Sequence, residues 1–399
     1  MQVKVHGKGT DSSAIRPLHV LELPSFFPPA GGLFCLDQAK ALVMLGNEVR
    51  ILSNVQLSIR LQRLRFFTYS YRRHWKECSG ITVYQSYQRG IPKVVRPNVE
   101  HWCNIVRSMF RDYVKKYGIP DILHAHCASW AGYTAMLISR EYGIPYVITE
   151  HYSRLIFEKE LGPPPSSAWE IPLLRAAYEH ASLVIPVAEE LVDSIACYFG
   201  RNYRWKAISN TIDVDFFRFK ERPLRTHRPF RFCCIANNIP LKGYDVLLPA
   251  FRSLERKGMN VELHIAGRHT DLPSFVEQLD VATMYSHGMM DKKGVRQLLY
   301  DCDALVLASR SEVQPLVLLE AMSTGIPVVG TECVPKSLRL PMGCRIVPTD
   351  NVQMLAEAME ACLTWNVDGR QLSEHIRQIA SPQVIGKQLS EVFAQCCSK

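Results

Sequence analysis

Two carboxylates, Glu312 and Glu320, lie eight positions apart in the stretch SEVQPLVLLEAMSTGIPVV, which covers residues 311–329. The rest of the stretch is mostly aliphatic, with Pro315 between the two acids and Gly325 after them. One interpretation is a solvated loop acid followed by a helix-surface acid. An acid without a partner is costly among apolar neighbours, however, and the pattern therefore favours two ligand-binding carboxylates.

We expect a helix to begin near Pro315 and to end at Gly325, because proline is favoured at the first helical position and glycine just past the last. The N–H groups of Leu316 and Val317 would then lack partners inside the helix. A helix start of this kind binds a phosphate well, because its N–H groups and its dipole both favour negative charge.

The two carboxylates would flank such a phosphate. Glu312 precedes the helix, and Glu320 lies about one and a half turns into it, with its side chain leaning back toward the helix start. Carboxylates accept hydrogen bonds, so they suit hydroxyl-rich groups. A ribose, a diphosphate and a hexose follow one another in a nucleotide sugar, and the pattern therefore favours a nucleotide sugar as ligand.

Short apolar runs alternate with helical patterns along the chain, which predicts parallel strands covered on both faces. The expected strands are at 18–24, 48–54, 121–127, 145–151, 182–188, 230–237, 261–267, 281–288, 303–309 and 326–331. The expected helices include 34–46, 130–143, 168–181, 189–200 and 244–258. Gly46, Gly118, Gly143 and Gly200 stand where helix C-caps are expected.

The fold class that follows is α/β, with two doubly wound Rossmann-like domains facing across a cleft. We expect an N-terminal domain at 1–210, a proline-broken linker at 211–228 and a C-terminal domain at 229–383. A last helix at about 384–399 would pack back on the first domain. Ligands of such sheets bind beyond the carboxyl ends of the strands, here in the cleft.

The composition limits the class of protein. The 399 residues are 47% hydrophobic, enough for a large core, and no apolar run approaches the roughly 20 residues that a membrane helix needs. The N-terminal stretch lacks the apolar centre of a signal peptide. Thirteen cysteines without a CxxC pair indicate reduced thiols in a cytoplasmic enzyme. Their spacing predicts no metal site, and we expect no cofactor.

The net charge of +9 is concentrated in one part of the chain, since residues 57–120 hold 13 Lys/Arg and 3 Asp/Glu. This local excess indicates an acidic partner at one surface and not a nucleic acid. Within it, the segment 57–76 holds six Lys/Arg and no acid. On a helix, its apolar residues Leu57, Leu61, Leu64, Tyr71 and Trp75 would form one stripe flanked by arginines, among them Arg60, Arg63, Arg65, Arg72 and Arg73.

We therefore expect 57–76 to be a helix that lies on an anionic membrane surface, which would make the protein peripheral on the inner face of a membrane. The alternative is that the apolar residues pack on the protein's own sheet while the arginines are solvated.

The sequence resembles the retaining GT-B glycosyltransferases of glycosyltransferase family four (glycosyl transferases group one). The stretch 311–329 has their signature, which is two glutamates separated by seven residues, then AM, a glycine and PVV. Seven further motifs follow the family order. They are FPPAGGLFCLDQAKAL (27–42), DILHAH (121–126), YVITEH (146–151), ISNTID (208–213), LKGYDVLLPAF (241–251), HIAG (264–267) and HGMM (287–290).

The resemblance implies a role for each matching residue. Glu312 would hold donor-sugar hydroxyls and face the reacting carbon, and Glu320 would hold the ribose hydroxyls. Lys242 would neutralise the diphosphate leaving group, and His126 would contact the transferred sugar. Gly31 and Gly32 would let the first-domain loop approach the diphosphate, and Gly288 and Met289 would border the base.

Two positions depart from the family pattern. Asn237 stands where an arginine usually provides a second diphosphate cation, so Lys242 would act alone unless Arg268 or another residue substitutes. Val313, Gln314 and Pro315 replace the usual glycines and aromatic residue.

Glu150 and His151 end the strand next to that of His126, and they could contact an acceptor together with Arg60, Arg63 and Arg65. The alternatives are that His126 is tied to backbone and that His151 only supports its loop. We expect His124, which points to the opposite side, to be structural.

The resemblance implies transfer of a hexose-type sugar to a glycan or a lipid-linked acceptor, with retention of configuration. No obvious nucleophile stands in the motifs, so a front-face route in which the leaving phosphate helps to deprotonate the acceptor fits best. The alternatives are a bilobal receptor, a nucleotide-sugar-binding relative with reduced catalysis, or a nucleotide-sugar epimerase. Labelled nucleotide sugars incubated with a lipid extract would separate these classes.

Overall fold

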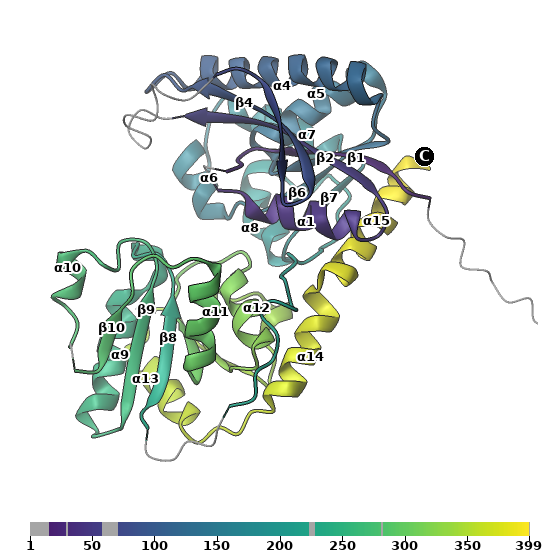
Figure 1. Cartoon of the computed structure of the whole chain (residues 1–399). Coiled ribbons are helices and arrows are strands. Elements are labelled where there is room, and N and C mark those ends of the chain that lie inside the picture. Colours follow the sequence, from purple (N-terminus) through teal and green to yellow (C-terminus); the bar gives the residue numbers. More distant parts are fainter. Residues whose placement is uncertain (1–15, 29–30, 58–70, 223–227, 281, 399) are drawn as a thin grey trace, which may run out of the picture.

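The computed structural model describes residues 16–28, 31–57, 71–222, 228–280 and 282–398, and it has two lobes (Figure 1). Each lobe is a sheet covered by helices, and the sheets are parallel apart from one edge strand. The predicted class, two Rossmann-like α/β domains, is therefore confirmed.

Within the described residues, the first sheet has seven strands in the order β3-β4-β2-β1-β5-β6-β7. The strands are β1 (His19–Pro24), β2 (Glu48–Leu57), β3 (His74–Cys78), β4 (Ile81–Arg89), β5 (Ile122–His126), β6 (Tyr146–Glu150) and β7 (Leu183–Pro186). β1 pairs with β2 on one side and with β5 on the other, so the strand order reverses there. Doubly wound sheets bind ligands at the carboxyl ends of such a switch point.

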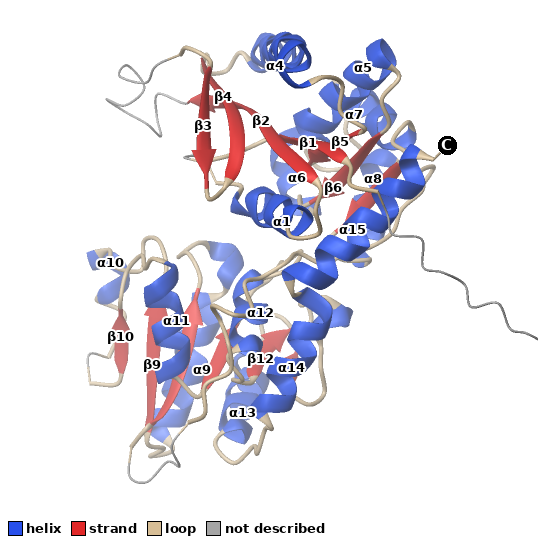
Figure 2. Cartoon of the chain, turned by 45° about the vertical axis from the view of Figure 1, so that its right-hand side comes forward, coloured by secondary structure: helices blue, strands red, loops and turns tan. Residues whose placement is uncertain are grey.

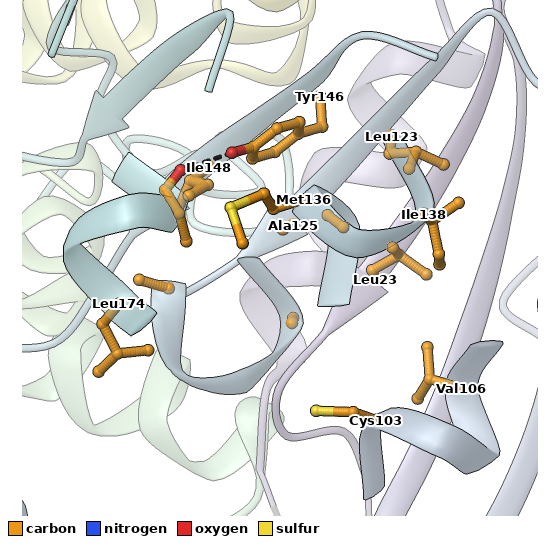
Figure 3. Packing of buried hydrophobic residues seen from close by; sticks show 14 of the residues in the cluster. Leu23, Cys103, Val106, Leu123, Ala125, Met136, Ile138, Tyr146, Ile148 and Leu174 are labelled. Atoms are coloured by element: carbon orange, nitrogen blue, oxygen red, sulfur yellow. Dashed lines mark hydrogen bonds between the residues drawn. The ribbon is translucent and has the colours of Figure 1, made fainter. Parts of the chain in front are cut away.

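Helices cover both faces of this sheet. They are α1 (Leu33–Val43), α4 (Val95–Tyr117), α5 (Tyr133–Tyr142), α6 (Arg154–Leu161), α7 (Glu170–Glu179) and α8 (Glu190–Phe199). Figure 3 shows how strand residues such as Leu23 and Ile148 pack against helix residues such as Met136 and Leu174. Because β5 and β6 are buried along their whole length, few of their polar side chains face water.

Glycine ends three of these helices as predicted. Gly118, Gly143 and Gly200 are the C-cap residues of α4, α5 and α8, and all three have positive φ. Gly46 differs from the prediction, because α1 ends at Val43 with Met44 as its cap.

The second sheet, again counted over the described residues, has six parallel strands in the order β10-β9-β8-β11-β12-β13. The strands are β8 (Phe230–Ile235), β9 (Val261–Ala266), β10 (Met284–Ser286), β11 (Ala304–Leu307), β12 (Val328–Thr331) and β13 (Cys344–Val347). The helices are α9 (Tyr244–Arg256), α10 (Pro273–Val276), α11 (Lys292–Asp301), α12 (Leu316–Ser323), α13 (Val352–Cys362) and α14 (Gly369–Ala380). The switch point here lies between β8 and β11.

The last helix, α15 (Pro382–Cys397), leaves the second domain and extends to the first, as both overall views show (Figures 1 and 2). Its Ile385, Leu389, Val392 and Phe393 belong to the same buried cluster as residues of β1 and β2. A Cβ on Gly386 would lie 2.3 Å from the carbonyl oxygen of Ala41, so only glycine allows α15 to approach α1 this closely.

The segment expected to link the domains is not simply solvated. Ile212, Val214 and Phe217 are buried in a cluster that belongs to the second domain. The backbone N–H of Ile212 donates to the carbonyl of Ala380 at 3.0 Å, next to the start of α15. The two crossings between the domains therefore lie side by side.

The prediction of one helix over 57–76 is wrong at both ends. Leu57 is the buried last residue of β2, and Trp75 lies in β3, which pairs antiparallel with β4. Trp75 stacks on Tyr84 with ring centroids 4.2 Å apart, so it packs on the protein's own sheet. Residues 58–70, with Arg60, Arg63 and Arg65, lie outside the described residues.

Candidate functional site

A cavity of about 460 Å³ opens at the carboxyl ends of β8, β9 and β11 in the second domain. Its lining includes six residues predicted to bind the donor, together with Arg268. These six are Asn237, Lys242, Met289, Glu312, Leu316 and Val317. The structure therefore brings together, in one concave site, residues that are up to 80 positions apart in the chain.

One end of this cavity is the start of α12. The helix begins at Leu316 and ends at Ser323, close to the prediction, with Pro315 as its N-cap and not as its first residue. Leu318 N–H donates to the carbonyl of Pro315, whereas Leu316 and Val317 precede the first intrahelical bond. Their N–H groups make this cavity wall suited to an anion.

Lys242 and Glu312, which both line this cavity, form a short ion pair. The Lys242 Nζ lies 2.6 Å from Glu312 Oε1, and the Ser309 hydroxyl donates to the same oxygen at 2.6 Å. The Glu312 side chain is 9% exposed and that of Lys242 is 24% exposed. A ligand phosphate could therefore compete with Glu312 for the lysine.

Glycine is required beside this pair. Gly243 has φ +65°, and a Cβ there would lie 2.0 Å from the carbonyl oxygen of Ala308. The loop of Lys242 and the end of β11 thus approach each other at backbone distance, which brings the lysine within reach of Glu312.

Asn237 has a structural partner in the position where an arginine was expected. Its Oδ1 accepts a hydrogen bond from the backbone N–H of Arg268 at 3.0 Å. Arg268 itself is exposed and lines the cavity. The asparagine therefore orders the loop after β9, and the guanidinium of Arg268 is a second cation available to a bound anion.

Glu320 lies apart from Glu312. It is half-buried on α12 and is not among the residues that line the cavity. Burial raises the pKa of its carboxyl to about 7, an effect reduced by Lys292 and increased by Asp37 of the first domain. Glu320 therefore lies near Lys292 of α11 and Asp37 of α1, at the side of the second domain that meets the first. The arrangement of both acids around one phosphate stays a prediction.

Two glycine-containing loops, Gly31–Gly32 and Gly288–Met289, were predicted to approach the donor. Gly31 and Gly32 have φ of +104° and +85°, and a Cβ on Gly32 would lie 2.1 Å from the Phe26 carbonyl oxygen. At Gly31 the nearest atom would be 3.9 Å away, an ordinary van der Waals contact, so a Cβ would meet no clash there. Gly288 accepts a hydrogen bond from Gly267 N–H at 2.8 Å, and Met289 is 72% exposed.

In the first domain, His126 at the end of β5 contacts a carboxylate that sequence reasoning missed. His126 Nε2 lies 2.7 Å from Glu22 Oε2 on β1, and both side chains are fully buried. His126 Nδ1 lies 3.3 Å from His151 Nε2. Both ring nitrogens thus have protein partners, which contradicts the expected direct contact of the His126 ring with a sugar.

His124 and Glu150 are internal. The expectation that His124 points away from His126 is wrong, because residues i and i+2 of a strand share a face. Both rings approach Glu22 Oε2, at 2.8 and 2.7 Å, and their centroids are 4.4 Å apart. The buried His124 also contacts the Thr149 hydroxyl at 2.6 Å, which agrees with the structural role expected for it. Glu150 has no exposed surface, and its two oxygens accept from three backbone N–H groups and from the Tyr178 hydroxyl. The prediction that Glu150 contacts an acceptor is therefore wrong.

Glu22, His124 and His126 are the described residues whose ligand atoms are close enough together to hold a metal, within 4.8 Å of one another. Their contacts of 2.7 and 2.8 Å are hydrogen-bond distances. Nitrogen and oxygen ligands around a tetrahedral zinc, at about 2.0–2.1 Å from the ion, lie roughly 3.3 Å apart. The geometry therefore fits a proton-sharing network better than a metal centre.

The loop of Glu312 is attached to both domains. Gln314 accepts from the Asn210 N–H at 2.6 Å and donates to the Ser209 hydroxyl at 2.7 Å, and Val313 packs on the first-domain core. A cavity of about 260 Å³ between the domains is lined by Ser153 and Glu312, among others. Glu312 thus borders both the donor-side cavity and the space between the domains.

Two family descriptions match the chain. Residues 32–216 match glycosyltransferase family 4, and residues 229–364 match glycosyl transferases group 1. Together these ranges cover most of the sequence and both Rossmann-like domains. The chain belongs to the GT-B glycosyltransferases of these families, as the sequence motifs predicted.

Individual relatives agree with this class. TuaC of Bacillus subtilis (strain 168), which is assigned to teichuronic acid biosynthesis as a glycosyltransferase, is 23% identical over 320 residues, or 77% of this chain and 78% of TuaC. The D-inositol 3-phosphate glycosyltransferase of Paenarthrobacter aurescens is 26% identical over 61% of this chain and 64% of that protein.

Solved structures share the fold. Sucrose-phosphate synthase from Thermosynechococcus elongatus superposes with a TM-score of 0.74, at 16% identity over 94% of this chain and 98% of that chain. Anabaena HepE in complex with UDP-glucose gives 0.65, at 17% identity over 94% and 99%. At these identities the likeness establishes the fold and not the substrate.

Proposed function

We propose that the protein is a retaining glycosyltransferase that moves a hexose-type sugar from a nucleotide-diphosphate sugar to a glycan or lipid-linked acceptor. The observation on which this rests is the Lys242–Glu312 pair in the lining of a cavity bordered by the start of α12. The names of the relatives TuaC and HepE, the latter crystallised with UDP-glucose, support assembly of a polysaccharide or glycolipid from such a donor.

Each group then has a role in the departure of the diphosphate. Negative charge grows on the leaving phosphate as the sugar approaches an oxocarbenium-like transition state. Lys242, the N–H groups of Leu316 and Val317, and the guanidinium of Arg268 are placed to stabilise that charge. Groups aimed at developing charge act most strongly where they need not reorganise. No metal is required in this scheme.

Glu312 is the group that changes partner. In this structure it accepts from Lys242 and Ser309. When a diphosphate binds to the lysine, the carboxylate becomes available to hydroxyls of the donor sugar. Glu320 would accept from the ribose hydroxyls, and the bare backbone at Gly31 and Gly288 would let the diphosphate and the base come close.

We place the acceptor near His151, which is half-buried at the end of β6. The basic excess of residues 57–120 would bring the first domain to an anionic membrane surface on the cytoplasmic side. No described helix is both long and apolar enough to cross a bilayer.

A thermal-shift screen against nucleotide diphosphates and their sugars tests the donor site directly. We expect stabilisation by one diphosphate, following RT ln(1 + [L]/Kd), and then transfer of labelled sugar into a lipid extract. Binding without transfer or hydrolysis would favour a binding protein, and conversion of the free nucleotide sugar to an isomer would favour an epimerase. Flotation with anionic and neutral vesicles at low and high salt tests the membrane contact.

A further inference from the structure

Three side chains form a continuous line of contacts from the interior of the first sheet toward the cleft. Glu22 on β1 contacts His126 Nε2 at 2.7 Å, and His126 Nδ1 contacts His151 Nε2 at 3.3 Å. Glu22 and His126 have no exposed surface, whereas His151 is half-buried. The last member alone can reach a ligand.

These contacts can be satisfied by one arrangement of protons. The two histidine neighbours lower the pKa of Glu22 to about 2 despite its burial, so it is ionised and can only accept. His126 Nε2 must then hold a proton. Burial lowers the pKa of His126 to about 4, so the ring is neutral near pH 7 and its Nδ1 is an acceptor.

The same reasoning extends to His151. The acceptor Nδ1 of His126 requires a proton on His151 Nε2. Burial and the two neighbouring histidines lower the pKa of His151, so this ring is neutral as well. A neutral imidazole with a proton on Nε2 offers an unshared pair on Nδ1. The state of Glu22 thus decides which nitrogen of His151 can accept a hydrogen bond.

The surroundings of His151 place it at the reaction side of the cleft. The ring of Phe34, in the first turn of α1 after Gly31 and Gly32, has its centroid 3.8 Å from that of His151. Ser153, two residues further on, lines the cavity between the domains together with Glu312. Sugar hydroxyls are the donors that this part of the cleft would receive.

The line of contacts is costly to bury, which argues that it serves more than packing. Glu22 Oε1 is buried and has no hydrogen-bond partner among the described residues. A buried carboxylate oxygen without a hydrogen-bond partner destabilises the folded state, because it loses its hydration and gains nothing in return. An apolar residue at position 22 would continue the strand HVLELP without this cost.

We propose that Glu22 is a positioning residue that acts through His126 to keep His151 Nδ1 as the hydrogen-bond acceptor for a sugar hydroxyl in the cleft. This inference rests on the proposed glycosyltransferase function. It assigns the cleft contact to His151 and gives His126 the task of transmitting the effect of Glu22.

Glu22→Gln tests the assignment. The glutamine amide can donate to His126 Nε2, which moves the His126 proton to Nδ1 and makes His151 Nε2 the acceptor. We expect the release of UDP from UDP-glucose, or from the nucleotide sugar that stabilises the protein most, to fall at least about 10-fold. The Kd of the nucleotide diphosphate should not change, because the donor site lies in the other domain.

Thr149→Val is the matched control. It removes a buried hydroxyl from the His124 side of the same carboxylate and leaves Glu22, His126 and His151 in place. Near-wild-type UDP release is expected. A loss equal to that of Glu22→Gln would show that any disturbance of this core lowers activity, and would overturn the proposal.

A double-mutant cycle with His151→Ala provides the decisive comparison. If Glu22 acts through His151, adding Glu22→Gln to His151→Ala should cause no further loss. Additive losses would contradict the proposal. Nitrogen-15 NMR of histidine-labelled protein gives an independent measurement, since the proton on His151 should move from Nε2 to Nδ1 in Glu22→Gln.

If the His151 tautomer in Glu22→Gln is the same as in the wild type, the inference is overturned, whatever the turnover of the variant. If the wild-type protein neither bound nor hydrolysed any nucleotide sugar, the proposed function would fail. The NMR measurement would still test separately whether Glu22 controls the tautomer of His151.

Discussion

The two walls of the cleft use charge in different ways. In the second domain, Lys242, Glu312 and Arg268 line an open cavity, and the Lys242–Glu312 pair can exchange its partner for a ligand. In the first domain, Glu22 and His126 contact each other below the surface. We propose that the wall in the second domain binds a charged group, and that the wall in the first domain fixes the orientation of the neutral His151 ring.

The largest effect should come from the second wall. Lys242→Ala removes the cation that we propose binds the leaving phosphate, and turnover should fall about 100- to 1,000-fold, by analogy with loss of one oxyanion donor. Lys257→Ala, which breaks an exposed pair with Glu360, is the matched control and should have little effect. Unchanged turnover in Lys242→Ala would mean that Arg268 neutralises the phosphate, and the contrast between the walls would need revision.

Substitutions in the loop of Gly31 and Gly32, in the first domain, change the steric fit of the backbone without changing any charge. Gly32→Ala should destabilise the fold by about 2–3 kcal/mol, since its Cβ would overlap the Phe26 carbonyl and its φ is left-handed. Gly31→Ala, whose Cβ would meet no clash, should cost only about 1 kcal/mol, which comes from its φ of +104°. Urea denaturation of both variants gives the comparison, and equal losses would contradict the steric argument.

The two glutamates of the second domain should separate binding from turnover. Glu320→Ala is expected to weaken nucleotide diphosphate binding about 10-fold, because two ribose hydroxyls lose an acceptor. Glu312→Ala should depress turnover but leave that affinity unchanged or improved, because Lys242 is released from its ion pair. Calorimetric titration beside a rate assay measures both. The assignment fails if both variants bind and turn over like wild type.

The smallest effect is an opposite pH response of the two walls. The pKa of His126 is about 4 in the folded protein and 6.5 in the unfolded chain. Between these two pH values the unfolded chain binds a proton that the folded protein does not, so stability falls as the pH drops from 6.5 to about 4. The pKa of Glu22 is lowered from 4.5 to about 2, so its contribution to the stability of the fold is lost as the pH falls from about 4.5 to 2. Glu320, raised from 4.5 to about 7, contributes stability below pH 4.5 that is lost as pH rises to about 7.

Chemical denaturation across about pH 4 to 7.5 therefore has a definite expectation. Glu320→Gln should steepen the rise in stability with pH, because the opposing contribution is removed and the histidine term remains. A pH profile identical to that of the wild type would show that Glu320 is not buried strongly enough to titrate near neutrality.

The difference between the two walls also explains which parts of the site could be predicted from the sequence. Lys242 and Glu312 stand in motifs whose local order, a lysine-glycine before a helix and a proline at a helix start, already predicts their surroundings. The cavity follows because parallel strands end at one edge. Glu22 and His126 are 104 positions apart, and no local pattern pairs them. The one available signal was an acid inside the apolar strand HVLELP, which a buried partner must compensate.

The error at residues 57–76 has a related cause. Its leucines fit a helical period, but β3 owes its structure to pairing with β4, and that pairing is a long-range property. Short apolar segments cannot be assigned to helix or strand from their periodicity alone. The alternative in which Trp75 packs on the protein's own sheet is the one observed.

The position of α15 makes the core of the first domain depend on residues that follow the second domain in the sequence. The first domain lacks Ile385, Leu389 and Phe393 until the last residues of the second have been synthesised, and the Phe393 ring packs on His124 at 5.0 Å. Domains usually fold as units in the order of synthesis. Here the buried clusters of the second domain contain no residue of α15. A chain still lacking α15 would leave the first-domain cluster without these side chains and the His124 ring without Phe393.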